Sequence, residues 1–142
     1  RVLFRSKSQG YDMSNKETYL TEMWVHQYFK YGSMEQHIHS NGSYITGFYI
    51  LEAPEKSCEI VLYDPRPAKI QMGIGFDFNE EISNSTNKIF FKPEPGMLLF
   101  TNSWLPHSFT RNASEEPFSF VHFNLSIKDY YPTQTFPPAE VI

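Results

Sequence analysis

The sequence predicts an all-β fold of the sandwich, barrel or jelly-roll type, and two observations carry this prediction. Aromatic residues make up 17% of the 142 residues and are accompanied by ten prolines, a composition that favours strands and turns over helices. Short strand-like runs also follow one another at close spacing, which is typical of all-β domains. An all-helical bundle is therefore not expected.

The expected strands are apolar or alternating runs bounded by turn residues. Asn41-Gly42 and the Pro-Glu-Pro-Gly segment at 93–96 are two such boundaries. In chain order, the runs are 20–29, 34–39, 44–51, 59–63, 69–72, 88–91, 97–101, 107–110 and 118–127. We expect the polar stretch 77–87 to be an exposed loop in the position of a lid, and the segment 129–142 to be a surface tail.

The length and net charge of the chain restrict the number of domains and the kinds of binding partner. A chain of 142 residues predicts one jelly-roll domain over 1–142, with a further N-terminal segment left open because the sequence begins at Arg1 and not at Met. A net charge of -4 does not favour binding to nucleic acid or to an anionic membrane. No apolar run approaches the roughly 20 residues of a membrane span. We expect a soluble, cytoplasmic protein, although a location in a virion remains an alternative. The protein could also form a homo-oligomer or be a component of a phage particle.

The only cysteine, Cys58, excludes an internal disulfide and a cysteine-based metal cluster. Any metal site must therefore use histidine and carboxylate ligands. The segment Glu35-Gln36-His37-Ile38-His39 offers such ligands, because strand alternation places Glu35, His37 and His39 on one face. Two histidines about 7 Å apart along a strand converge on one ion if the strand ends or twists there. A pair of polar residues on an exposed strand is the alternative, so a third ligand is needed.

His107 is the candidate third ligand. It follows the apolar strand 97–100, and the return of a late strand beside an early one in a jelly roll would bring it to His37 and His39. Two ligands on one strand and one far downstream form a facial arrangement with open coordination positions. We therefore expect a metal site of His37, His39 and His107, with Glu35 and Asp64 as the carboxylates that could complete it.

Several motifs together resemble a known family. In order, they are Trp24-Val25-His26-Gln27, His37-Ile38-His39, Ile45-Thr46-Gly47-Phe48-Tyr49-Ile50, Tyr63-Asp64-Pro65-Arg66, Pro95-Gly96-Met97-Leu98-Leu99-Phe100, Trp104-Leu105-Pro106-His107 and Phe123-Asn124. This ordered set is similar to the 2-oxoglutarate and Fe(II)-dependent oxygenases common in marine bacteria and phages. The resemblance covers roughly 23–126. It implies a double-stranded β-helix, which is a cupin-like jelly roll, with Fe(II) between its two sheets and 2-oxoglutarate as co-substrate.

The sequence departs from the wider superfamily at two positions. His39 stands where that superfamily has an acidic ligand, which gives a three-histidine site unless a carboxylate comes from elsewhere. The superfamily also places an Arg or Lys about ten residues after the distal histidine, where it pairs with the far carboxylate of 2-oxoglutarate. Pro117 and Phe118 occupy that region here. The remaining candidates for co-substrate binding are Tyr49, which matches a family position for the same carboxylate, and Arg66 and Arg111.

Three functions remain open at this point. The first is a non-haem Fe(II)- and 2-oxoglutarate-dependent dioxygenase, an oxidoreductase that hydroxylates an unknown substrate. The second is a jelly-roll binding or structural module without redox activity, which the absent carboxylate and the absent Arg favour. The third is a three-histidine cupin-type dioxygenase that needs no 2-oxoglutarate. Metal content and succinate release from 2-oxoglutarate distinguish them.

Overall fold

The computed structural model describes residues 10–39, 42–67, 82–83 and 85–129. These residues belong to two compact units. The larger unit, Leu20–Ser126, contains the histidine cluster described below and most of the residues of the two sheets. The smaller unit combines the two chain ends, and ion pairs join Lys16 to Asp129 and Lys128 to Glu17 within it.

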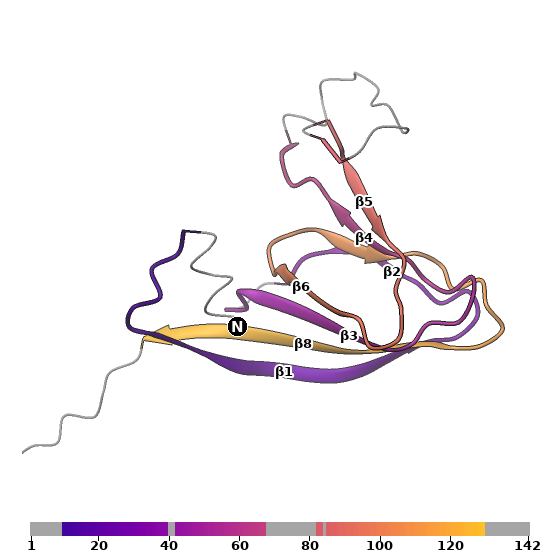
Figure 1. The fold of residues 1–142 in the computed structure, drawn as a ribbon, viewed down its shortest axis with the longest axis horizontal. Coiled ribbons are helices and arrows are strands. Elements are labelled where there is room, and N and C mark those ends of the chain that lie inside the picture. The colour runs from indigo at the N-terminus through magenta and orange to yellow at the C-terminus, as the bar shows by residue number, and fades with distance from the viewer. Residues whose placement is uncertain (1–9, 40–41, 68–81, 84, 130–142) are drawn as a thin grey trace, which may run out of the picture. The chain divides into compact units, whose positions relative to one another are not determined.

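The described residues form eight strands, and their bounds are β1 Lys16–Tyr28, β2 Met34–His37, β3 Ile45–Glu52, β4 Ile60–Tyr63, β5 Lys88–Phe91, β6 Leu98–Asn102, β7 His107–Phe109 and β8 Phe118–Asp129. They form two four-stranded sheets with the orders β1-β8-β3-β6 and β2-β7-β4-β5. The last strand, β8, lies between β1 and β3, strands far from it in the sequence (Figure 1). This interleaving of early and late strands is the jelly-roll arrangement, and it confirms the predicted fold class.

Side chains alternate between the interior and the outer face of each sheet. On β8 the inward residues Phe118 and Phe120 are 0% and 1% exposed. The Phe120 ring stacks on Phe109 of the opposite sheet with centroids 4.6 Å apart, and Phe48 of β3 meets Phe109 edge-on at 5.4 Å. The core therefore lies between the sheets and is mainly aromatic.

The structure agrees with eight of the nine expected runs and changes some of their ends. β1 starts four residues earlier than expected, and β2 ends at His37, two residues earlier than expected. The pairing of β2 with β7 shifts register between Met34 and His37. The expected strand 69–72, most of the loop 77–87 and the tail beyond Asp129 lie outside the described residues. No helix in the described part of the chain has the length and hydropathy of a membrane span.

Candidate metal centre

The pairing of β2 with β7 brings the first two histidines together. His37 and His107 are directly opposite each other on these neighbouring antiparallel strands, and their ring centroids lie 4.4 Å apart. His107 is fully buried, whereas His37 is half-buried. Strand register alone therefore places two imidazoles side by side at the edge of the interior.

His39 joins this pair from just beyond the end of β2. Its backbone N–H donates to the carbonyl of Ser103 at 2.8 Å, which fixes the chain where the strand stops. Its ring stacks on the His107 ring with centroids 5.1 Å apart and an angle of 11°. One ligand atom from each of the three histidines lies within 4.8 Å of the other two. The structure thus brings His37, His39 and His107 together, as the sequence predicted.

Backbone carbonyls fix which ring nitrogen two of the histidines present to the cluster. The Nδ1–H of His37 donates to the Glu35 carbonyl at 2.8 Å, and the Nδ1–H of His107 donates to the Leu105 carbonyl at 2.9 Å. Because a neutral imidazole carries one proton, the Nε2 atoms of both residues are then unprotonated and able to coordinate a metal. The Nε2 atom of His39 lies 3.2 Å from that of His107.

Burial lowers the pKa of two of these imidazoles, His107 and His39. Desolvation lowers the pKa of His107 to about 4, against which the bond to Leu105 acts weakly. Desolvation and the neighbouring His37 also lower the pKa of His39, while Glu22 acts in the opposite direction. Protons therefore compete little with a metal ion for His107 and His39 at neutral pH.

A buried amide supports His39 from behind. Asn124 of β8 is 1% exposed and its Oδ1 accepts a hydrogen bond from the Thr46 hydroxyl at 2.9 Å. Its Nδ2 donates to the Glu22 carboxylate at 3.1 Å and lies 3.4 Å from Nδ1 of His39. Asn124 belongs to a sequence motif, but its contact with Glu22 is not evident from the sequence, because it depends on the β1-β8-β3 arrangement.

His122 extends the cluster of imidazoles into the interior. Its ring is 2% exposed, stacks on His39 at 4.7 Å and lies 4.4 Å from the Trp24 ring. Neither ring nitrogen has a hydrogen-bond partner among the described residues. Desolvation is the main cause that lowers its pKa to about 3. His122 is thus a neutral residue that packs against a candidate ligand.

The two candidate carboxylates, Glu35 and Asp64, are not part of the cluster. Within the described residues, the group able to hold a metal consists of the three histidines alone. Glu35 is exposed and contributes its backbone carbonyl to His37. Asp64 is held by Arg66, whose Nη2 donates to its carboxylate at 2.7 Å.

The three candidates for co-substrate binding lie apart from the histidines. Tyr49 is 41% exposed on the outer face of β3, because its inward neighbour on the strand is Phe48. Arg111 is exposed after the end of β7. Arg66 is exposed and bound to Asp64 in the turn after β4. The structure therefore does not bring any of these side chains to the cluster.

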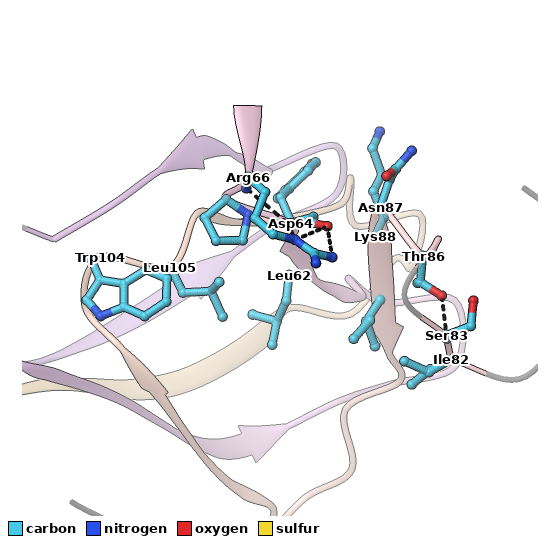
Figure 2. A pocket seen from close by; sticks show the side chains of 13 residues that line it. Leu62, Asp64, Arg66, Ile82, Ser83, Thr86, Asn87, Lys88, Trp104 and Leu105 are labelled. Atoms are coloured by element: carbon cyan, nitrogen blue, oxygen red, sulfur yellow. Dashed lines mark hydrogen bonds and ion pairs between the residues drawn. The ribbon is translucent and has the colours of Figure 1, made fainter. Parts of the chain in front are cut away.

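A largely apolar pocket of about 480 Å³ adjoins the segment that leads into His107. Trp104 and Leu105 line one side and Ile82 the other, with Leu62 and the Asp64–Arg66 pair between them (Figure 2). Two of the residues that line the pocket also contact His107. Leu62 is the cross-strand partner of His107, and Leu105 accepts its Nδ1–H hydrogen bond.

Comparisons with known proteins agree with this geometry. The crystal structure of an oxidoreductase of the 2OG-Fe(II) oxygenase family from Burkholderia pseudomallei has a TM-score of 0.62 at 13% identity, over 89% of this chain and 52% of that one. The non-heme alpha ketoglutarate dependent epimerase SnoN from nogalamycin biosynthesis has a TM-score of 0.57 at 12% identity, over 86% of this chain and 59% of that one. This chain thus spans about half the length of these structures, and the likeness shows a shared fold.

No curated protein matches the sequence. The family model described as "Putative 2OG-Fe(II) oxygenase" matches residues 22–124, a range that includes the three histidines and Asn124. Membership of that family implies Fe(II) and 2-oxoglutarate. The match extends over well more than half of the chain, and this protein therefore belongs to the 2OG-Fe(II) oxygenase family.

Proposed function

We propose that this chain is the catalytic barrel of a mononuclear non-haem iron oxygenase, which uses a 2-oxo acid and dioxygen to hydroxylate a C–H bond of its substrate. The observation that carries the proposal is the convergence of His37, His39 and His107 within 4.8 Å in a jelly-roll interior. The family match extends over all three residues and supports the same function.

The donor set suits an iron ion. Imidazole nitrogen is a ligand that iron accepts, and three ligands on one side of an ion leave positions open for other molecules. Bound iron would activate dioxygen by transferring electrons to it. In the overall reaction, a substrate C–H, dioxygen and the 2-oxo acid give the alcohol, carbon dioxide and a carboxylic acid one carbon shorter.

The chain's own residues orient the ligands and exclude water. The Glu35 and Leu105 carbonyls hold the rings of His37 and His107 by their Nδ1–H groups, which is the outer support that metal-binding histidines require. Phe48 meets the His107 ring edge-on at 5.3 Å and closes the interior side of the site. Three neutral ligands also leave the full charge of a metal uncompensated, which favours an anionic co-substrate.

The two ends of 2-oxoglutarate fit this site differently. Its 2-oxo and adjacent carboxylate groups match the open positions of a three-histidine centre. Its far carboxylate finds no cation in the barrel interior among the described residues, where Phe118 occupies the expected position of an Arg or Lys.

Anaerobic titration of metal-free protein with Fe(II), followed by calorimetry, tests the proposal. We expect one metal ion per chain and a loss of affinity of more than about 100-fold for His37→Ala and for His107→Ala, because each removes a direct ligand. His26→Gln is the matched control, since His26 lies outside the cluster. Failure of the wild-type protein to bind metal would instead favour the binding-module alternative.

Product analysis then separates the two kinds of oxygenase. Release of a shortened acid from an added 2-oxo acid supports the proposed reaction. Metal-dependent uptake of dioxygen without any 2-oxo acid would contradict it and favour the three-histidine cupin-type dioxygenase.

A further inference from the structure

His39 presents its ring nitrogens differently from the other two histidines of the cluster. The Nδ1–H groups of His37 and His107 donate to backbone carbonyls, so their Nε2 atoms are unprotonated. Nδ1 of His39 instead lies 3.4 Å from Nδ2 of Asn124, which is a donor. Nδ1 is therefore the acceptor in this contact. The proton of the neutral His39 ring is then on Nε2, which lies 3.2 Å from Nε2 of His107 and donates to it.

The other partners of Asn124 fix the orientation of its amide. Its Oδ1 accepts the hydrogen of the Thr46 hydroxyl at 2.9 Å, and its Nδ2 donates to Oε2 of Glu22 at 3.1 Å. An ionised carboxylate can only accept hydrogen bonds, so Nδ2 and not Oδ1 faces Glu22 and His39. The Nε2–H tautomer of His39 thus follows from the Glu22 carboxylate through a single amide.

Coordination of a metal through Nε2 requires the opposite tautomer of His39. The ion takes the lone pair of Nε2, so the ring proton must be on Nδ1. The proton that leaves Nε2 is replaced by one at Nδ1, and the ring stays neutral. The new Nδ1–H faces the Asn124 donor, and the acceptor beside that donor is the Glu22 carboxylate.

Glu22 is placed to be that acceptor. Strand alternation puts it on the same face of β1 as Trp24, whose ring packs on His122 in the interior. The Thr21 hydroxyl donates to the Asn124 carbonyl at 3.1 Å and holds β1 against β8 at this level. Oε2 of Glu22 accepts from Asn124, whereas Oε1 has no hydrogen bond with any residue that the structure describes. One carboxylate oxygen is thus available for a second donor.

We propose that Glu22 is a positioning residue for the metal centre, whose carboxylate accepts the Nδ1–H of metal-bound His39 and supplies negative charge that three histidine ligands lack. The inference rests on the proposed metal centre. The charge of Glu22 already acts on this ring, since it opposes the desolvation that lowers the His39 pKa. A carboxylate behind a coordinating imidazole fixes its tautomer and makes it a stronger ligand.

Metal affinity measures the effect of this carboxylate. Fe(II) is titrated anaerobically into wild-type protein and Glu22→Gln, and binding is followed by calorimetry. We expect the variant to bind Fe(II) about 10–100-fold more weakly, the loss typical of removing an outer partner of a metal ligand. Glu22→Asp keeps the charge and should recover part of the affinity.

Glu52→Gln is the matched control. Glu52 also accepts a side-chain hydrogen bond, from the Ser119 hydroxyl at 2.7 Å, but it lies at the end of β3 that is distant from Thr46. The substitution removes the same charge from the same sheet and should leave the Fe(II) affinity unchanged. Glu22 is exposed, so neither variant is expected to disturb the fold, which denaturant unfolding checks.

Two further measurements report on the role of Glu22 directly. Nitrogen NMR spectra of the histidine rings distinguish a protonated from an unprotonated Nδ1. We expect Nδ1 of His39 to be unprotonated without metal and protonated once Zn(II), a diamagnetic probe, is bound, whereas Nδ1 of His37 and His107 is protonated in both states. The Fe(III)/Fe(II) reduction potential of iron-loaded Glu22→Gln should be higher than that of wild-type protein, because the lost negative charge stabilised the more positive ion.

Several results would overturn the inference. One is equal Fe(II) affinity of wild-type protein and Glu22→Gln. Another is an equal loss in Glu22→Gln and Glu52→Gln, which would assign the effect to overall charge. Protonation of Nδ1 of His39 before metal is added would remove the change of tautomer. Each of these results leaves the metal centre in place, whereas failure of the wild-type protein to bind metal would overturn the proposed function and this inference together.

Discussion

Two layers of the same barrel interior differ sharply in chemistry. We call the first the histidine layer, which consists of His37, His39, His107, Thr46 and Asn124, and the second the phenylalanine layer, which consists of Ile50, Ile60, Phe109, Phe118 and Phe120. β3, β7 and β8 each contribute to both layers through inward residues a few positions apart. The same strands therefore form a candidate binding site and a stabilising core next to each other. The two layers differ in the type of their inward residues.

The largest expected effect on stability comes from the phenylalanine layer. Phe120→Ala removes a ring that is 1% exposed and packs on Phe48, Phe109 and Phe118. We expect the free energy of unfolding in denaturant to fall by about 3–5 kcal/mol, the range for removing a buried aromatic ring and leaving a cavity. Metal affinity, measured where the variant remains folded, should change little. A tenfold loss of metal affinity would show that the two layers are not independent.

A substitution in the histidine layer should reduce metal binding more than it reduces stability. His107→Leu removes a candidate ligand but keeps an apolar side chain in a buried position, so we expect loss of metal binding with a smaller change in unfolding free energy than Phe120→Ala gives. Calorimetric metal titration and denaturant unfolding of the same preparation measure both quantities. Unfolding of this variant under native conditions would contradict the separation.

A smaller loss of stability is expected from replacing Asn124, whose amide joins polar groups on neighbouring strands of one sheet. Asn124→Ala leaves the Thr46 hydroxyl without its acceptor in the interior and removes the donor to Glu22. We expect the unfolding free energy to fall by about 1–3 kcal/mol. Thr46→Val in the same background should then add little, because its partner is already gone. Full additivity of the two changes would show that the Thr46 to Asn124 bond contributes nothing.

The smallest expected effect is a pH dependence. The pKa of His122 is about 3 in the folded protein, below its ordinary value of 6.5. Above pH 6.5 both folded and unfolded forms are neutral, and below it only the unfolded chain gains a proton, so stability decreases as the pH falls. His122→Phe should reduce the decrease in Tm between pH 7 and pH 5 without abolishing it, because His107, with a pKa of about 4, contributes in the same direction. Equal slopes for both proteins would assign the pH dependence to other groups.

Sequence patterns predicted the strands well because each run combined β-forming residues with defined turn residues at both ends. The approach of His107 to His37 was also predictable, since it follows from strand return in a jelly roll. The contacts that support His39 were not predictable, because Glu22 meets Asn124 only when β8 lies between β1 and β3. Tyr49 shows a related limit, since its motif indicated a role but strand alternation places it on the outer face.

The buried thiol of Cys58 gives the phenylalanine layer a built-in reporter. Cys58 is 0% exposed within the core cluster, and desolvation raises its pKa to about 11. A thiol that is both protonated and shielded does not react with alkylating agents while the layer is closed. The rate of Cys58 alkylation therefore measures how often this layer opens. Because Cys58 is the chain's only cysteine, that rate can be compared with and without metal without interference from a second thiol.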